Sequence, residues 1–260
     1  MDDGEYQRLI DGLNTPEDIQ TFLSEGYDKR LLETLYTQKV NRGVKRKYHF
    51  VKKNSAKMLR MWKKGDSICK IADKFGFPPI LTAMMIFQEN GTSKKIFWEY
   101  VRDPSLLDSE ETADELREAS ERDLVYSLEG NERSRERGQW GENLLWTWLD
   151  GQDVKYKTEA DEREEDNQQG SKTPDCLLAQ PMNFEGRKIH WIESKASFGD
   201  VTEFKFNLTK QLQPYTELFG PGVVVYWTGH LDSLVNECPE GVHLEDIGIL
   251  EKTITPWEGE

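Results

Sequence analysis

The chain has 260 residues, three cysteines and a formal net charge of −14 at pH 7. This length suffices for one large domain or for two modest ones. The cysteines are odd in number, widely spaced and without a CxxC pair, which argues against a disulfide framework and against a structural zinc site. No apolar run approaches the ~20 residues that span a bilayer, and no segment resembles a signal peptide, so we expect a soluble, intracellular protein.

Charge is distributed unevenly along the chain. Residues 1–101 contain 18 Lys and Arg against 13 Asp and Glu, whereas residues 102–260 contain 16 against 35. Such an asymmetry predicts two domains with different roles, and we place their boundary at residues 103–104, between a domain of residues 1–103 and one of residues 104–260. The acidic surface of the second domain could serve a protein partner, solubility or a salty cytoplasm.

The first third of the chain is expected to be helical. Thr15 is predicted to cap a helix with Pro16 at its first position and acids in its first turn. Three short helices are expected between residues 55 and 87, in the order typical of a helix-turn-helix. The third of these helices offers no Arg or Lys, so a helical scaffold with a basic flank for backbone contact is favoured over base-specific readout.

That basic flank is the run from Lys39 to Lys64, which has eleven Lys and Arg and no acid. An ordinary solvated helix face usually mixes both signs of charge, so the run favours contact with the phosphate backbone of a nucleic acid. The cations expected at this interface are Lys45, Arg46, Lys47, Lys52, Lys53, Lys57, Arg60, Lys63 and Lys64.

The second domain is predicted to combine helices and strands. Apolar periodicity indicates helices at residues 133–149 and 206–219, the second of them kinked or shortened by Pro214. Strands are expected at residues 176–178, 188–196 and 223–227, the last of them buried on both faces. The order helix, strand, strand, helix, strand predicts an α/β fold with a mixed sheet. The polar stretch from residue 158 to residue 172 is expected to be a loop.

The residues that carry chemistry gather around two of these strands. The segment Lys172–Asp175 precedes the first strand, and the second strand ends in Glu193-Ser194-Lys195. Asp175 and Glu193 offer hard carboxylate oxygens of the kind that Mg²⁺ prefers, with Mn²⁺ as a substitute. Lys195 lies two residues beyond Glu193, so both side chains point to one face of the strand. This set predicts a site for a divalent metal ion, an attacking water molecule and a scissile phosphate, where Lys195 orients or deprotonates the water.

Three further residues are expected near this site. Glu142 lies in the preceding helix and could add an outer metal contact. Gln211 and Tyr215 lie in the following helix and could steady a phosphate or the water. A Pro-Asp dipeptide is also frequent in ordinary turns, so these additions strengthen a motif that is weak alone.

These residues and their surroundings resemble the TPD-motif family, also called the codanin-interacting nuclease family. The resemblance rests on Lys172–Asp175, Ile189–Asp200, Phe219–Gly222 and Val225–Trp227, and it is dense over residues 172–228. It implies a restriction-endonuclease-like fold of the PD-(D/E)xK superfamily, with a mixed sheet flanked by helices behind an all-helical N-terminal domain. It also implies the metal carboxylates, lysine, helix glutamate and QxxxY element of that superfamily at the positions given above.

We therefore expect a Mg²⁺-dependent nuclease that acts on DNA or structured RNA. The alternatives are an adaptor that binds nucleic acid or protein without cutting, and a helix-turn-helix regulator whose duplex binding does not need the C-terminal half. We expect the protein in the cytoplasm if it is archaeal, and in the nucleus or cytoplasm if it is eukaryotic.

Overall fold

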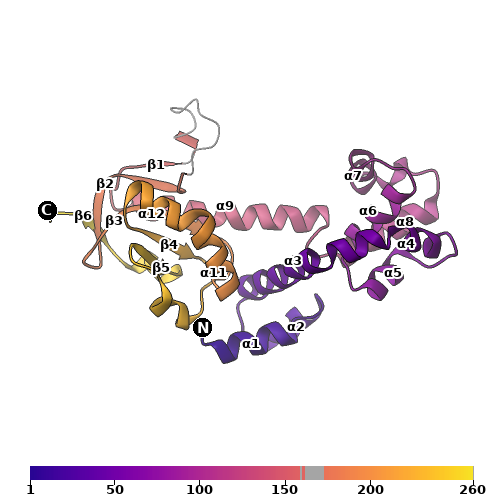
Figure 1. Ribbon diagram of the computed structural model, residues 1–260, viewed down its shortest axis with the longest axis horizontal. Coiled ribbons are helices and arrows are strands. Elements are labelled where there is room, and N and C mark those ends of the chain that lie inside the picture. Colours follow the sequence, from indigo (N-terminus) through magenta and orange to yellow (C-terminus); the bar gives the residue numbers. More distant parts are fainter. Residues whose placement is uncertain (159, 162–172, 260) are drawn as a thin grey trace. The chain divides into compact units, whose positions relative to one another are not determined.

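The computed structural model describes residues 1–158, 160–161 and 173–259 (Figure 1). Its contacts divide the chain into two compact units, one formed by Met1–Leu35 with Arg137–Glu260 and the other by Tyr36–Glu136. The boundary expected at residues 103–104 falls inside the second unit. It was placed by composition, whereas the first 35 residues pack with the sheet: the Tyr6 ring stacks on Phe198, and its hydroxyl donates to Asp200 at 2.6 Å.

The helices of the N-terminal part follow one another closely. They are α1 (Asp3–Gly12), α2 (Asp18–Ser24), α3 (Lys29–Lys53), α4 (Ser55–Trp62), α5 (Ile68–Phe75), α6 (Pro79–Glu89), α7 (Lys94–Arg102) and α8 (Glu110–Arg122), with a 3-10 turn at Pro104–Leu106. The three helices expected between residues 55 and 87 are present as α4, α5 and α6. Ser67 caps α5 by accepting a hydrogen bond from Lys70 N–H, and Gly76 ends it with a φ of 54°.

The start predicted for α2 is two residues early. The helix begins at Asp18, and the cap position is Glu17, whose side chain makes no capping hydrogen bond. Asp18 instead accepts hydrogen bonds from Asn14 N–H and Thr15 N–H, so its carboxylate organises the turn before the helix.

The core of the second unit is built around α6. Six residues of this helix are buried: Ile80, Thr82, Ala83, Met85, Ile86 and Phe87. All of them except Thr82 pack with Met58 of α4, Ile71 of α5 and Leu116 of α8 in one apolar cluster. The helix in the position of a recognition helix is therefore the central core helix of its unit.

The sheet of the first unit is mixed. Its strands are β1 (Tyr156–Thr158), β2 (Cys176–Phe184), β3 (Arg187–Lys195), β4 (Gly222–Tyr226), β5 (Val242–Glu245) and β6 (Ile254–Pro256). The strand order is β1-β2-β3-β4-β5, with β6 paired to β2. β2 is antiparallel to β1, β3 and β6, whereas β3, β4 and β5 are parallel. All five residues of β4 are buried, as expected for a strand covered on both faces.

Helices cover both faces of this sheet (Figure 1). α9 (Leu128–Asp150) contributes Leu145, Trp148 and Leu149 to a core shared with Ile192 and Val223. The opposite face is covered by α11 (Val201–Asn207), a π-helical turn at Leu208–Leu212 and α12 (Gln213–Phe219). This helical segment starts five residues earlier than predicted. Pro214 lies in the first turn of α12 and follows the π turn, which supplies the irregularity that a proline requires inside a helix.

Short 3-10 segments at Asp232–Glu237 and Ile247–Glu251 connect the last strands. None of the helices in the described part of the chain has the length and apolar character needed to cross a membrane.

Candidate active site

Asp175 and Glu193 face each other across two antiparallel strands. Cys176 of β2 pairs with Ile192 of β3, so the next position outward places Asp175 opposite Glu193. Asp175 N–H donates to Glu193 Oε2 at 3.2 Å, and Ser194 N–H donates to Asp175 Oδ2 at 2.8 Å. Where β2 begins and β3 ends, the backbone N–H groups thus donate to side-chain carboxylates in place of backbone carbonyls of the neighbouring strand. The two acids that are 18 residues apart in sequence are direct neighbours in space.

Lys195 completes this group. Its ammonium donates to Glu193 Oε1 and forms an ion pair with it. The side chain of Glu193 is only 2% exposed and that of Lys195 is 16% exposed. Burial is the main cause that raises the pKa of Glu193 to about 7, the negative charge of Asp175 adds to the increase, and Lys195 opposes it. The structure therefore holds a carboxyl group that can gain or lose a proton near neutral pH.

Tyr215 and Gln211 lie beside the segment that leads into Asp175. The Tyr215 hydroxyl donates to Thr173 C=O at 2.9 Å, and Gln211 Nε2 lies 3.5 Å from the Tyr215 hydroxyl. The Tyr215 ring packs edge-on against Trp191 of β3, with ring centroids 5.5 Å apart. The helical segment that carries Gln211 and Tyr215 thus contacts the chain next to the site. The Tyr215 hydroxyl holds the backbone at Thr173, two residues before Asp175. Lys172, the first residue of the motif, lies outside the described residues.

Glu142 lies on α9, which covers the other face of the sheet. The preceding Gly141 packs directly on Trp227, and Trp227 Nε1 donates to Ser194 Oγ at 2.7 Å. α9 therefore passes over Ser194, the residue between Glu193 and Lys195 in the sequence. Glu142 is half-buried in this part of α9. Its role as an outer metal contact stays a prediction. The supporting contact through Trp227 was not expected from the sequence, because the indole and the hydroxyl are 33 residues apart.

The donor set suits a hard cation that keeps most of its water. Mg²⁺ is commonly bound through one or two carboxylates together with substrate phosphates, and Asp175 and Glu193 supply two. Within the described ranges, no group of three or more His, Cys, Asp and Glu side chains forms a ready-made metal cage. The residues present thus fit Mg²⁺ shared with a phosphate better than a structural metal.

The chain matches one known protein family over more than half of its length. The profile of a family described as "Protein of unknown function TPD sequence-motif" matches residues 108–247, more than half of the chain. The chain belongs to the TPD sequence-motif family. The matched region contains Asp175, Glu193 and Lys195, together with Glu142 and the Gln211–Tyr215 element.

Relatives of this TPD-family chain carry the name "CDAN1-interacting nuclease 1". The protein from Homo sapiens is 31% identical over 182 residues, 67% of this chain and 64% of its own length. The protein from Bos taurus is 28% identical over 227 residues, 83% of this chain and 77% of its own length. The protein from Xenopus laevis is 47% identical over 75 residues, so this match spans 29% of the chain and 25% of the relative. No solved structure matches at a significant level.

The nine cations predicted to contact nucleic acid lie outside the region matched by the family profile. All nine predicted nucleic-acid contacts are exposed, on the second half of α3, on α4 and just after it. Lys47 Nζ donates to Gly76 C=O at 2.9 Å, so this cation caps the end of α5. Among the cations, Tyr48 is 37% exposed and Phe50 is 58% exposed, whereas Trp62 is half-buried and donates to Glu115 at 2.9 Å.

Proposed function

We propose that this protein is a divalent-metal-dependent nuclease that hydrolyses phosphodiester bonds in DNA or structured RNA. The observation that carries the proposal is the hydrogen-bonded group of Asp175, Glu193 and Lys195 at one edge of the sheet. Two adjacent acids and a half-buried ammonium carry a desolvation cost, which a site for a metal ion and a phosphate would explain. The name "nuclease" borne by the relatives supports the same reading.

Asp175 and Glu193 would hold Mg²⁺ or Mn²⁺ through their carboxylate oxygens. When bound, the ion would supply charge neutralisation at the phosphate and lower the pKa of its water. Glu193 would lose its proton as the ion binds, because a carboxylate ligand must be ionised. Lys195 would then exchange part of its contact with Glu193 for the phosphate, where it stabilises the negative charge that develops in the transition state.

Tyr215 would act by positioning. Its hydroxyl holds Thr173 C=O, so the backbone that carries Asp175 is fixed on both sides of the carboxylate. Gln211 would extend this hydrogen-bonded chain toward a phosphate oxygen. Glu142 is proposed as an outer contact to the ion.

The architecture supports assignment to the PD-(D/E)xK superfamily, with its restriction-endonuclease-like fold. A mixed sheet with helices on both faces presents an acid before one strand and Glu-x-Lys at the end of the next. This is the arrangement that the resemblance of the sequence implies.

We further propose that the cations of α3 and α4 bind the phosphate backbone. The nine predicted contacts are exposed, and they belong to a run from Lys39 to Lys64 that contains no acid. The buried state of α6 counts against a helix-turn-helix regulator that reads bases with this helix. The relatives' name also suggests a protein partner, for which the exposed acids of α8 offer one surface.

The test is a panel of single-stranded, duplex, flapped and branched DNA and RNA incubated with Mg²⁺, Mn²⁺ or EDTA. Cleavage should require the metal ion and should be lost in Asp175→Asn, Glu193→Gln and Lys195→Ala. The matched controls are Glu217→Gln and Lys210→Ala, which remove one exposed acid and one exposed cation from the same unit. Cleavage that survives all three site variants would show that the site is wrongly assigned.

Metal binding distinguishes a nuclease from an adaptor that binds nucleic acid without cutting it. A nuclease site should raise the melting temperature as Mg²⁺ or Mn²⁺ is added, and Asp175→Asn should remove this effect. An adaptor should bind the same nucleic acids with no metal-dependent stabilisation and no cleavage.

A further inference from the structure

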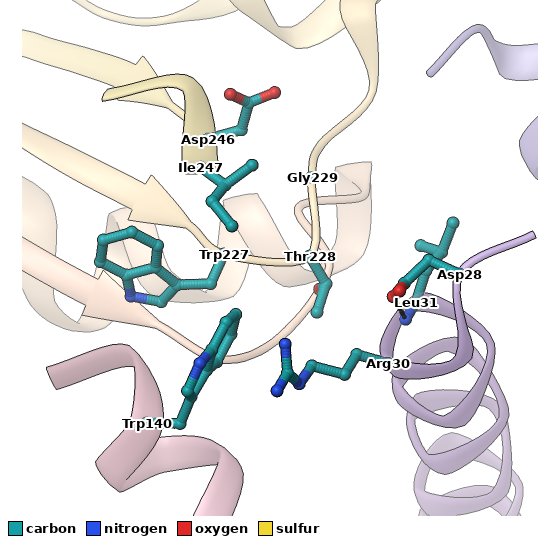
Figure 2. Close-up of a pocket in the computed structure, with 9 residues that line it drawn as sticks. All are labelled: Asp28, Arg30, Leu31, Trp140, Trp227, Thr228, Gly229, Asp246 and Ile247. Atoms are coloured by element: carbon teal, nitrogen blue, oxygen red, sulfur yellow. Dashed lines mark hydrogen bonds between the residues drawn. The ribbon is translucent and has the colours of Figure 1, made fainter. Parts of the chain in front are cut away.

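We infer that a pocket on the α9 side of the sheet, next to the end of β3, binds one unpaired nucleobase of the nucleic-acid strand. The pocket is lined by Arg30 and Leu31 of α3, Trp140 of α9, and Trp227, Thr228 and Asp246 from the ends of the parallel strands (Figure 2). The inference rests on the proposed nuclease function and deepens it by naming what the site recognises.

The size and walls of the pocket suit a planar ring. Its volume is about 300 Å³, at the lower end of the range for small-molecule sites, which suits one ring system. Trp140 and Trp227 form two walls, with ring centroids 6.2 Å apart and planes at 67°. The Arg30 guanidinium lies 4.2 Å from the centre of the Trp140 ring. Indole faces and guanidinium planes are the surfaces on which proteins stack unpaired bases.

Polar groups at the rim suit the edge of a base. Asp246 Oδ1 accepts from Gly248 N–H at 2.8 Å, and its other oxygen has no hydrogen bond within the described part of the chain. That oxygen can accept from the exocyclic amine of adenine, cytosine or guanine. Thr228 Oγ1 also has no hydrogen-bond partner among the described residues. Figure 2 shows Asp246 and Thr228 on the β-strand side of the pocket, with Arg30 and Trp140 across from them.

The pocket adjoins the strand end that carries the catalytic lysine, on the opposite face of the sheet from the lysine side chain. Trp227 N–H donates to Lys195 C=O at 3.0 Å, and its indole N–H donates to Ser194 Oγ at 2.7 Å. Lys195 pairs with Tyr226, whose hydroxyl accepts from Asn207 of α11, so the side chains of Lys195 and Trp227 point to opposite faces of the sheet. A single strand would reach both by passing around the end of β3 and β4. A base held here would therefore belong to a nucleotide a few steps along the strand from the phosphate that is cut.

This position has a consequence for the substrate. A base can enter the pocket only if it is not paired or stacked in a duplex. The pocket thus favours single strands, flaps or ends over an intact duplex, and it provides a place where the protein distinguishes them.

The experiment measures binding separately from cleavage. The full chain carrying Glu193→Gln is titrated against a fluorescent twelve-nucleotide single strand, and against the same strand with an abasic site moved through each position. We expect one abasic position to weaken binding about five- to a hundredfold, the range for loss of one stacked base. Arg30→Gln and Trp140→Leu, each added to Glu193→Gln, should weaken binding of the intact strand to a similar degree. They should also remove the effect of the abasic site.

Lys29→Gln is the matched control. Lys29 is an exposed cation directly before Arg30, it does not line the pocket, and its pair with Glu33 is long, at 3.8 Å. Its loss should change affinity less than threefold and should keep the abasic effect. Thr228→Val, which keeps the shape of the side chain, tests the hydroxyl without disturbing the fold.

The outcomes separate this inference from the proposed function. If wild-type protein cleaves nucleic acid but no abasic position and no pocket variant matters, the pocket is not a base site and the nuclease function stands. If pocket variants change base-dependent binding but no cleavage is found under any metal condition, the pocket stands and the nuclease function fails. A pocket that instead binds an apolar side chain of a protein partner would give variants that bind every strand like the control, and this would also overturn the inference.

Discussion

The buried carboxyl group of Glu193 should make the stability of the protein depend on pH. In the metal-free protein, Glu193→Gln should gain stability relative to wild type as pH rises from 4.5 to 8. Glutamine has the shape of the protonated acid and keeps one oxygen to accept from Lys195, but its amide nitrogen cannot accept from Asp175 N–H as Glu193 Oε2 does. The substitution therefore removes the pH-dependent cost of ionising a carboxyl group that is 2% exposed, and adds a pH-independent cost for the lost hydrogen bond from Asp175 N–H.

The magnitude follows from the pKa. Burial raises the pKa of Glu193 from its ordinary 4.5 to about 7. Between these pH values the folded protein holds a proton that the unfolded chain has released, so the free energy of unfolding falls as pH rises. Each pKa unit is worth about 1.4 kcal/mol, which gives a total of about 3 kcal/mol. The stability from this group is fully present below pH 4.5 and is lost as pH rises through 7.

The assay compares urea unfolding of wild type and Glu193→Gln in EDTA at closely spaced values from pH 4 to pH 8. Between pH 4 and pH 8 the difference in unfolding free energy should shift by about 3 kcal/mol in favour of the variant, and should level off above pH 7. The exposed Glu217→Gln is the control and should stay within about 0.5 kcal/mol at every pH. A difference that is constant with pH, or a variant that loses stability relative to wild type as pH rises, would refute the reasoning.

Three other predictions follow from packing, hydrogen bonding and charge. Gly141→Ala should destabilise the protein by about 1–3 kcal/mol in thermal unfolding, because its Cβ would lie 2.4 Å from Trp227 Cδ1. Gly138→Ala in the same helix meets nothing within 4 Å and should stabilise it by about 0.5–1 kcal/mol, so equal effects of the two would contradict this packing. Tyr215→Phe leaves the buried Thr173 carbonyl without its donor at 2.9 Å, so it should lower the free energy of unfolding by about 1–3 kcal/mol. It should also lower kcat more than it raises KM, and an unchanged kcat would exclude a positioning role for Tyr215. Replacing three exposed cations of α3 by Gln should reduce the slope of log affinity against log salt concentration by about 2–3, and an unchanged slope would place phosphate contact elsewhere. These cations are Lys45, Lys52 and Lys53.

Much of the local structure could be predicted from the sequence. The continuous apolar run at residues 223–227 predicted a buried strand, and β4 is buried at every position. The alternation around Glu193 and Lys195 predicted two side chains on one face, and their ion pair confirms it. These features depend on residues close together in the chain, where spacing alone fixes direction.

Other elements could not be found in this way. β1, β5 and β6 have three, four and three residues, too few to show a period, and each exists because a neighbouring strand offers its backbone groups. The π turn at Leu208–Leu212 likewise reflects how one helical segment accommodates Pro214 while covering the sheet.

The sequence by itself determined the chemical groups of this protein: two carboxylates, a lysine and a run of cations. Tertiary structure decided which of them meet. The pairing of β2 with β3 sets Asp175 against Glu193, and the burial that follows moves the Glu193 pKa toward neutrality. The pocket of Arg30, Trp140 and Trp227 joins segments more than 80 residues apart and leaves no trace in any local pattern. Spacing along the chain is covalent and can be read directly, whereas register, burial and cavities arise only when distant segments pack.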